Sequence, residues 1–280
     1  MNHQTKYAII GLGYISERHL RAIKETGGDV VLAFDSHETG GILDRYFLNA
    51  KFPDMQIDFW KALAASGAEY LVICTPNHLH YEDIAEGRRQ GLKVICEKPL
   101  CVKYSDALTL IDDENVFTIL QLRLHPTSQL LKKRIASLKK AGTDKLYVEV
   151  TYHTPRGEWY HRTWKSKNMS GGILLNIGVH IFDLLIDLFG MPKNSLCRKD
   201  DESAFCCLEC ENADIKVNLS ISRNVTAKRE IKVNGMPFDL TSGFDNLHTE
   251  SYKAILEGNG FKVSDAVKAL KLVDELNNKA

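Results

Sequence analysis

The chain has 280 residues, of which 44% are apolar and 26% are charged, and its 36 basic side chains balance its 36 acidic ones. This composition is typical of a folded globular protein of one large or two modest domains, and it excludes wholesale disorder. The lack of a basic excess argues against a nucleic-acid partner, and no apolar run approaches the ~20 residues of a membrane-spanning helix. We therefore expect no nucleic acid and no membrane as partners. The first residues lack the layout of a signal peptide, so we expect a cytoplasmic location.

Short apolar runs alternate with helix-like segments over the first 122 residues. The runs that we expect to form strands cover residues 7–10, 31–34, 70–74, 93–96 and 117–122, and the expected helices cover residues 16–25, 57–66, 80–90 and 104–113. Fully apolar strands that alternate with helices predict a parallel sheet covered on both faces. Residues 1–122 are therefore predicted to form a doubly wound α/β domain of the Rossmann type.

The pattern changes after residue 123. The predicted order is a basic helix, an alternating strand, an aromatic and basic loop, a long apolar helix, four strands and two amphipathic helices, at residues 128–140, 145–153, 154–172, 173–189, 202–210, 214–222, 229–235, 236–240, 248–258 and 263–278. Strands in series with flanking helices predict an α+β domain with a largely antiparallel sheet over residues 123–280.

The seven cysteines are an odd number, which fits a reducing compartment better than a disulfide framework. Cys206, Cys207 and Cys210 form the tightest group, for which half of a zinc site is one interpretation. A zinc site needs further ligands at close spacing, and none lies nearby in the sequence. We therefore favour two strands around a polar turn, with cysteine as a small apolar filler.

A dinucleotide-binding turn follows the first predicted strand. Residues 11–16 read Gly-Leu-Gly-Tyr-Ile-Ser, so Ser16 takes the third small position of the strand–GxGxxG–helix pattern. Gly11 permits the tight turn, Gly13 lets a pyrophosphate approach the backbone, and the helix N-terminus offers N–H groups to the phosphates. Asp35 ends the second strand, where a carboxylate accepts hydrogen bonds from ribose hydroxyls and repels a 2′-phosphate. The pattern predicts NAD(H) rather than NADP(H), and the alternative is a structural turn with Asp35 as a helix cap.

Two further strand ends are expected at the same crevice, because ligands of open α/β sheets bind outside the carboxyl ends of the strands. Residues 75–78 follow the third predicted strand, and Glu97-Lys98-Pro99 follow the fourth. A proline in each loop restricts its backbone. From spacing alone, a surface ion pair between Glu97 and Lys98 is as good an interpretation as a binding site.

These motifs together carry a family resemblance. The GLGYI turn, the CTPNHLH loop, the Glu-Lys-Pro tripeptide and the GGILLNIGVHIFDLL helix resemble the Gfo/Idh/MocA family of NAD(P)-dependent oxidoreductases over essentially the whole chain. The resemblance implies an NAD-binding domain over residues 1–122 and a substrate-binding domain over residues 123–280. It also implies that the open sheet of the second domain supports a homo-oligomer, for which we expect a tetramer.

A narrower resemblance involves GYISERHLRAIKETG, ICEKPL, ILQLRLH, the TPRGEWYHRTWK loop, NIGVHIFD and LHTESYKAIL. These segments are similar to the bacterial UDP-N-acetyl-2-amino-2-deoxyglucuronate dehydrogenases of the same family. The similarity implies NAD-dependent oxidation of the 3-hydroxyl of UDP-N-acetylglucosaminuronate, a UDP-sugar uronate, in lipopolysaccharide and O-antigen sugar biosynthesis. A further partner, 2-oxoglutarate, recycles the cofactor in some relatives.

The second domain departs from the commoner family pattern, Asp-x-x-x-His, because residues 176–180 read Asn176-Ile-Gly-Val-His180. Positions i and i+4 share a helix face, so both side chains can face one cleft, but the Asn puts an Asp–His relay in doubt. Asp183 can either orient the His180 ring or only cap the buried face. The resemblance implies Lys98 as the proton-handling residue with His180 as its partner, and we leave the division of roles open. Without the family, a core histidine on an apolar helix would be the better interpretation of His180.

The expected site residues follow from the motifs and the resemblance. The cofactor-binding residues are Gly11, Gly13, Tyr14, Ile15, Asp35, Thr75, Asn77, His80, Glu97, Lys98 and Gln121, and the substrate-binding residues are Lys98, Arg123, Arg156, Lys165, Asn176 and His180. Arg156 and Lys165 come from a cationic and aromatic loop. In a protein without net charge, such a loop predicts recognition of an anionic sugar nucleotide, and a solvated loop or an oligomer contact is the alternative.

Three functions are weighed, and the first is an NAD-dependent sugar-nucleotide 3-dehydrogenase. A family enzyme that acts on a free sugar or inositol is the second, and the cationic loop argues against it. A non-catalytic NAD-binding regulator is the third, and the retention of Lys98 and His180 argues against it.

The sequence offers one weak set of metal candidates, the histidines His19, His78 and His80. His78 and His80 stand at i and i+2, so they do not share a helix face. We predict no metal.

Overall fold

The computed structural model describes residues 3–37, 40–163 and 168–278, which form two compact units. The first unit comprises the residues up to 101, residues 105–119 and residues 245–265; the second comprises residues 102–104, 120–244 and 266 onward. The boundary near residue 120 lies close to the one we expected from the sequence. Residues 245–265 differ from that expectation, because they pack with the first unit although they come late in the chain.

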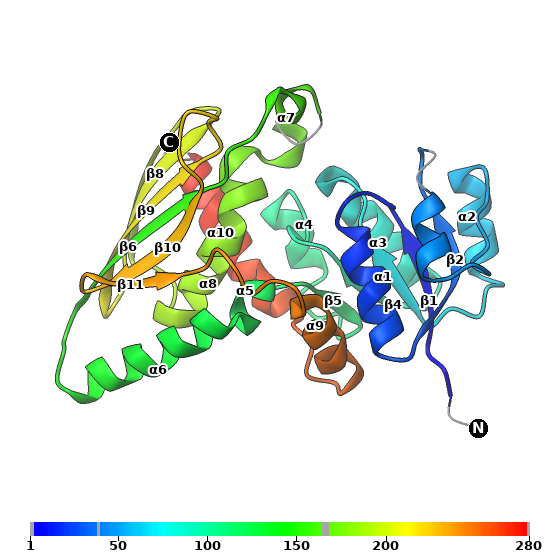
Figure 1. Cartoon of the computed structure of the whole chain (residues 1–280), viewed down its shortest axis with the longest axis horizontal. Helices are drawn as coiled ribbons and strands as arrows, with labels where there is room; N and C mark the ends of the chain where they lie inside the picture. Colours follow the sequence, from blue (N-terminus) through cyan, green and yellow to red (C-terminus); the bar gives the residue numbers. More distant parts are fainter. Residues whose placement is uncertain (1–2, 38–39, 164–167, 279–280) are drawn as a thin grey trace. The chain divides into compact units, whose positions relative to one another are not determined.

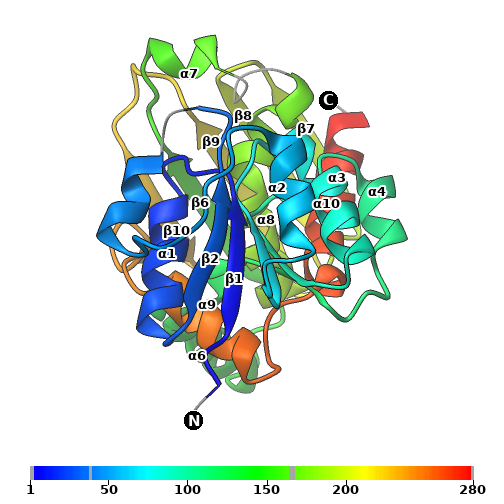
Figure 2. The ribbon, with the colours of Figure 1, turned by 90° about the vertical axis from the view of Figure 1, so that its right-hand side faces the viewer.

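A five-stranded parallel sheet forms the centre of the first unit, in the order β2-β1-β3-β4-β5. Its strands are β1 (Lys6–Ile10), β2 (Asp29–Phe34), β3 (Tyr70–Ile73), β4 (Lys93–Cys96) and β5 (Val116–Thr118). All residues of β3 and β5 are buried, as expected for strands covered on both faces. In Figure 2, α1 lies on one side of β1 and β2, and α2 and α3 lie on the other. The predicted doubly wound Rossmann domain is confirmed.

The helices of this unit follow the apolar periodicity of the sequence. They are α1 (Ser16–Glu25), α2 (Gln56–Leu63), α3 (His80–Arg89), α4 (Tyr104–Thr109) and α9 (Leu247–Leu256), with short 3₁₀ turns η1 (Gly40–Arg45) and η2 (Asn77–Leu79). Leu20 and Ile23 of α1 are fully buried, and the chain leaves this helix through Gly27 at a φ of 78°. Helix α9 packs against α1. The late segment therefore supplies part of the cover of the Rossmann sheet.

The predicted strand at residues 117–122 is shorter in the structure. Strand β5 ends at Thr118, and residues 121–124 form the helix α5 (Gln121–Leu124). The amide of Thr118 bonds to the carbonyl of Phe261 at 2.9 Å, from the late segment. A short apolar run does not by itself distinguish a strand from a helical turn, and the tertiary partners decide here.

The second unit is built on a six-stranded mixed sheet in the order β11-β10-β6-β9-β8-β7. Strands β6 and β9 pair in parallel, and the other neighbours pair antiparallel, so the sheet is largely antiparallel as predicted. The strands are β6 (Leu146–His153), β7 (Asn194–Lys199), β8 (Ser203–Glu209), β9 (Ala213–Ser220), β10 (Lys228–Val233) and β11 (Met236–Asp239). Strand β7 was not predicted, because only Cys197 of this polar edge strand is buried.

The helices of the second unit are α5, α6 (Pro126–Lys140), α7 (Glu158–Arg162), the 3₁₀ turn η4 (Asn168–Ser170), the π-helical turn η5 (Leu174–Gly178), α8 (Val179–Phe189) and α10 (Val263–Asn278). Figure 1 shows α8 and α10 on one side of the six-stranded sheet. A Cβ atom on Gly178 would lie 2.9 Å from Leu219 of β9, so η5 approaches the sheet closely. Residues 158–162, expected to be loop, form the short α7.

The cysteine-rich segment forms β8 and the residue after it, as the strand interpretation predicted. Cys206 and Cys210 are buried, Cys207 is half-buried, and all three are free thiols.

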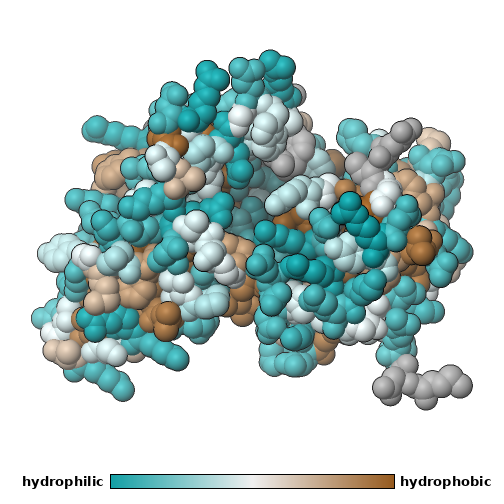
Figure 3. All heavy atoms as spheres, viewed as in Figure 1, coloured by the Kyte–Doolittle hydropathy of each residue, from teal (hydrophilic) through white to brown (hydrophobic). Residues whose placement is uncertain are grey.

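In the described parts of the chain, no helix combines the length and the apolar character needed to cross a membrane. The face drawn in Figure 3 is mostly hydrophilic, with apolar side chains scattered over it.

Candidate active site

The glycine turn after β1 is closed on one side and open on the other. Gly11 has a φ of 89°, and a Cβ atom there would lie 2.6 Å from the carbonyl carbon of Cys74, so only glycine fits. At Gly13 nothing lies within 4 Å of a would-be Cβ atom. Ser16 is fully buried and donates from Oγ to the Gly13 carbonyl at 2.7 Å. The turn therefore presents a bare backbone at Gly13, where a pyrophosphate can approach.

Asp35 is tied to this turn through its carboxylate. Its Oδ2 accepts from the amide of Leu12 at 2.6 Å, and its Oδ1 accepts from the amide of His37 at 2.8 Å. Strand order reverses between β1 and β3, and the crevice at such a switch point is where dinucleotides bind. Tyr14 is highly exposed beside the turn. The residues present thus fit a dinucleotide with free ribose hydroxyls.

The loop after β3 is fixed from within the domain. Thr75 donates from Oγ1 to Asp83 at 2.6 Å, and burial raises the pKa of Asp83 to about 6. His80 is buried, and its ring nitrogens face the carbonyls of Thr75 at 2.8 Å and Pro99 at 2.7 Å. Burial lowers the pKa of His80. The ring thus links two loops, and our expectation that His80 binds the cofactor stays a prediction. Asn77 is buried at the start of η2.

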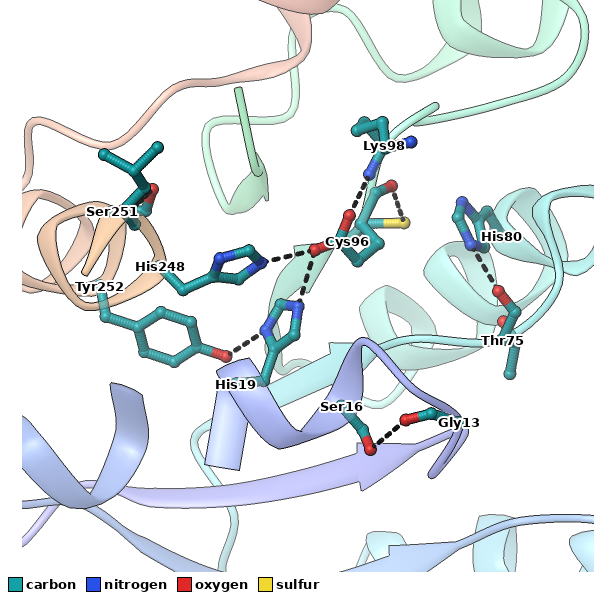
Figure 4. Close-up of polar contacts among 12 residues, drawn as sticks. Gly13, Ser16, His19, Thr75, His80, Cys96, Lys98, His248, Ser251 and Tyr252 are labelled. Atoms are coloured by element: carbon teal, nitrogen blue, oxygen red, sulfur yellow. Dashed lines mark hydrogen bonds and ion pairs between the residues drawn. The ribbon is translucent and has the colours of Figure 1, made fainter. Parts of the chain in front are cut away.

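The Glu-Lys-Pro tripeptide follows β4 and does not form a surface ion pair. Glu97 is only 5% exposed, and its Oε1 accepts from Nε2 of His19 at 3.0 Å and from Nε2 of His248 at 2.9 Å. Its Oε2 accepts from the backbone amide of Lys98 at 3.1 Å. Figure 4 shows both imidazole rings turned towards the same oxygen, with the Lys98 side chain pointing away from them. Lys98 is half-buried.

In the part of the chain that the structure describes, His19, Glu97 and His248 are the one group that could hold a metal ion. All three are buried, and the hydrogen bonds between them already use the atoms that would bind a metal. The sequence analysis did not predict this group, because Glu97 and His248 lie 78 and 151 residues from their partners in the sequence. It weighed His19 only together with His78 and His80. The absence of a resident metal stays a prediction.

In the second unit, Arg123 forms a buried ion pair. Its Nε and Nη2 donate to the two carboxylate oxygens of Asp183 at 3.0 and 2.7 Å, and Asp187 lies 3.9 Å from Nη1. This bidentate pair gives both residues a role between α5 and α8. Our expectations that Arg123 binds substrate and that Asp183 orients His180 stay predictions beside this pair.

Asn176 and His180 lie on either side of the junction between η5 and α8. The predicted single helix therefore begins with a π-helical turn, a feature that is frequent at functional sites. Asn176 is buried and donates from Nδ2 to the Tyr160 hydroxyl at 2.6 Å. Burial raises the pKa of Tyr160. His180 is half-buried. Sequence reasoning missed Tyr160 as the partner of Asn176, although the aromatic loop was the signal for it.

Three further expected residues have different outcomes. The Arg156 guanidinium lies 5.9 Å above the Tyr160 ring, and its buried Nε has no partner among the described residues. Gln121 is buried at the start of α5, where its Oε1 likewise lacks a partner within the described chain. Lys165 lies outside the described residues.

Comparisons with known proteins agree with this arrangement. The Gfo/Idh/MocA profile, an oxidoreductase family with an NAD-binding Rossmann fold, matches residues 5–115, and the profile of its C-terminal alpha/beta domain matches residues 145–235. The WlbA (WbpB) dehydrogenase from Thermus thermophilus, solved with NAD and alpha-ketoglutarate, is 35% identical over 99% of this chain and 96% of that one, with a TM-score of 0.93. The chain belongs to the Gfo/Idh/MocA family. The same Thermus enzyme solved with NAD and UDP-GlcNAcA has a TM-score of 0.91 at 34% identity, over 99% of this chain and 95% of that one.

Curated relatives match over shorter stretches. The 2,7-anhydro-N-acetylneuraminate hydratase of Mediterraneibacter gnavus is 28% identical over 194 residues, which are 67% of this chain and 50% of the relative. The NADP⁺-dependent scyllo-inositol 2-dehydrogenase IolW of Bacillus subtilis is 28% identical over 148 residues, which are 51% of this chain and 41% of that one. The chain thus spans about half or less of the length of these relatives. The first unit is an NAD-binding Rossmann domain. The roles of Gly11, Gly13 and Asp35 in holding the dinucleotide stay predictions.

Proposed function

We propose that the protein oxidises the 3-hydroxyl of UDP-N-acetylglucosaminuronate to the 3-keto sugar nucleotide, as a step in lipopolysaccharide or O-antigen sugar biosynthesis. The observation that carries this proposal is the near-full-length likeness to the Thermus dehydrogenase solved with NAD and UDP-GlcNAcA. When bound, NAD⁺ supplies the acceptor for the hydride that leaves the sugar carbon. The protein's own residues must then remove the hydroxyl proton and hold the sugar nucleotide.

Lys98 and His180 are the proposed catalytic residues. The backbone at Lys98 is held on one side by the Glu97 carboxylate, and the next residue, Pro99, is held by His80. A half-buried amine on so fixed a loop is suited to take the hydroxyl proton or to steady the forming alkoxide. His180 is its proposed partner in proton transfer, as an imidazole has an ordinary pKa of ~6.5.

Arg156, Asn176 and Tyr160 are the proposed residues for sugar-nucleotide recognition in the second unit. Arg156 keeps a buried Nε donor without a partner among the described residues, and a guanidinium suits a carboxylate or a diphosphate. The Asn176 side chain is fixed by Tyr160, so it can present a polar group at a defined position. Lys165 stays a candidate from the sequence.

The open face of the six-stranded sheet is proposed to contact a second copy of the chain. Tyr147, Leu196 and Phe205 on this sheet are 66%, 57% and 46% exposed, respectively. Apolar side chains of this size at a sheet surface are typical of a contact between subunits. Light scattering coupled to size-exclusion chromatography tests the expected homotetramer, and a monomer would contradict it.

The function is tested by mass spectrometry. Purified protein is incubated with UDP-N-acetylglucosaminuronate and NAD⁺, with and without 2-oxoglutarate, and parallel reactions contain scyllo-inositol or free N-acetylglucosamine. Loss of two hydrogens from the sugar nucleotide is the expected result. Formation of 2-hydroxyglutarate would identify cofactor recycling, in which 2-oxoglutarate is reduced as NADH returns to NAD⁺. Turnover of the free polyol alone, by a protein that binds NADH, would contradict the proposed substrate.

A further inference from the structure

A buried hydrogen-bond network surrounds Glu97 and includes two histidines far apart in the sequence. His19 comes from α1, and His248 and Tyr252 come one helical turn apart on α9. Nδ1 of His19 lies 2.8 Å from the Tyr252 hydroxyl, while Nε2 of both histidines faces Glu97. All four residues are at most 5% exposed. The network is therefore buried away from solvent. Which of its atoms carry protons is determined by the hydrogen bonds among these four residues.

The proton positions follow from the chemistry of the acceptor. An ionised carboxylate only accepts hydrogen bonds, so Nε2 of His19 and Nε2 of His248 both carry protons. In a neutral His19, Nδ1 then accepts from the Tyr252 hydroxyl. Burial alone would raise the pKa of Glu97, but the bonds from the two histidines outweigh it and hold that pKa well below its ordinary value. Burial lowers the pKa of His19, which fits the neutral ring.

The second carboxylate oxygen of Glu97 connects the network to the backbone of Lys98. Glu97 Oε2 accepts from the Lys98 amide, so the two histidines act on one oxygen and the backbone of Lys98 on the other. A carboxylate with three donors at fixed positions has one orientation. Loss of a histidine donor would free the carboxylate to rotate, and the Lys98 amide would lose its fixed acceptor.

We propose that His19 and His248 are positioning residues for Lys98: their N–H groups hold the Glu97 carboxylate, and that carboxylate fixes the backbone from which the Lys98 side chain extends. The proposal rests on the proposed catalytic role of Lys98 and not on the identity of the sugar. A purely structural role for the histidines would change the stability of the Rossmann domain without changing the behaviour of the Lys98 amine.

Three variants separate these roles. His248→Leu removes the donor at similar volume, and His248→Gln keeps an N–H donor near the position of Nε2. Thr249→Val is the matched control, because Thr249 is also buried on α9 and donates to Glu25 at 2.6 Å without contacting Glu97. Circular dichroism and NADH fluorescence establish that each variant folds and binds cofactor.

The first readout needs no substrate. Competitive acylation with acetic anhydride over a pH series, followed by peptide mass spectrometry, reports the reactivity of the Lys98 amine, with the exposed Lys61 as an internal reference. We expect His248→Leu to shift the pH midpoint of Lys98 acylation by about half a unit, a threefold change in the neutral fraction, or more. His248→Gln and Thr249→Val should leave it at the wild-type value. A folded His248→Leu protein with wild-type Lys98 acylation would overturn the proposal.

The second readout is turnover of UDP-N-acetylglucosaminuronate. A misplaced catalytic amine should lower kcat of His248→Leu by up to about a hundredfold with little change in KM, while His248→Gln restores most of it. Unchanged kcat in His248→Leu would also overturn the proposal. If the wild-type protein does not turn over this sugar nucleotide, the proposed function fails, and the acylation experiment still decides the role of His248.

A milder variant serves if His248→Leu does not fold. Tyr252→Phe removes only the hydroxyl that faces His19, and it should shift Lys98 acylation in the same direction by a smaller amount. Elemental analysis adds an independent check of the chemistry. About one equivalent of zinc in the purified protein, lost in His248→Gln, would mean that the two Nε2 atoms bind metal and carry no proton, and the proposal would be overturned.

Discussion

Gly11 lies so close to the backbone of Cys74 that a Cβ atom at Gly11 would be 2.6 Å from the Cys74 carbonyl carbon. The cofactor turn therefore packs directly against the residue that follows β3. The φ of Gly11, 89°, is a second reason why this position needs glycine. We expect Gly11→Ala to destabilise the protein by about 1–3 kcal/mol or more, because the residue is strained and the strand must move. NADH binding should be lost with it. Thermal unfolding and NADH fluorescence titration measure both effects.

Gly13→Ala is the matched control for this prediction. A Cβ atom there meets nothing within 4 Å, so the variant should keep the wild-type melting temperature while its NADH affinity falls. The reason is that the methyl group occupies the space through which a pyrophosphate approaches the backbone. Equal losses of stability in the two variants would contradict the division of roles between the two glycines.

Tyr160→Phe tests the partner of Asn176. Removal of the hydroxyl leaves the buried Nδ2 of Asn176 without the acceptor that it meets at 2.6 Å, which should cost about 1–3 kcal/mol of unfolding free energy. Since the amide then loses a bond that fixes its orientation, kcat/KM for the sugar nucleotide should also fall. Urea unfolding and steady-state kinetics check the two effects separately. A fall in stability with unchanged kinetics would exclude Asn176 from substrate recognition.

Arg123→Met tests whether the Arg123 ion pair is structural. The variant leaves the Asp183 carboxylate buried without its bidentate partner, so we expect a loss of about 3–5 kcal/mol in unfolding free energy. The double variant Arg123→Met/Asp183→Leu removes both charges and should recover most of that loss. If Arg123 binds substrate instead, the double variant will be stable but will show a strongly raised KM.

Lys98→Ala should abolish turnover and leave the fold intact. The side chain is half-buried, and the loop is held through its backbone and through Glu97, so the melting temperature and NADH affinity should stay close to wild type. Loss of a proton-transfer group should lower kcat by about 10²–10⁴-fold. Single-turnover kinetics with UDP-N-acetylglucosaminuronate measure the effect. Normal turnover in this variant would remove Lys98 from the mechanism.

The sequence predicts the architecture of the Rossmann unit well because its signals are local. Apolar runs, a glycine turn and helical periodicity lie within short windows, and α1 has the predicted bounds. The elements that differ depend on distant partners. Strand β5 is shortened where Phe261 binds Thr118, and β7 is a polar edge strand with one buried residue. Residues 245–265 join the first unit through tertiary contacts that no local pattern encodes.

The candidate site divides in the same way. Gly11, Gly13 and Asp35 belong to one motif, and the structure places them together at the end of β1 and β2. His248 is 151 residues from its partner Glu97, and in the sequence it is only a histidine on an amphipathic helix. The ion pair between Arg123 and Asp183 was not predicted either, because 60 residues separate the two side chains in the sequence.

Stability should fall on mild acidification, because two buried histidines, His19 and His80, titrate differently in the folded and unfolded chain. Burial lowers the pKa of His19 and of His80, so below their unfolded pKa of ~6.5 only the unfolded chain gains these protons. Each histidine therefore lowers the unfolding free energy by about 1.4 kcal/mol per pH unit as the pH falls towards its folded pKa. Above pH ~7.5 neither contributes a slope.

Titration of Asp83 changes the unfolding free energy in the opposite direction to that of the two histidines. This difference in sign allows the contributions to be separated in variants. Burial raises its folded pKa to about 6, so its contribution is fully present below the unfolded value of ~3.9 and is lost as the pH rises through 6. Below about pH 6 Asp83 therefore cancels the slope of one histidine, so the net slope should level off there instead of continuing to steepen. Urea unfolding in half-unit steps from about pH 5 to pH 8 measures this curve. Asp83→Asn should steepen the slope below pH 6, and His80→Gln should reduce it above pH 6. A wild-type curve that stays flat from pH 7.5 to 5.5 would contradict the lowered pKa of both histidines.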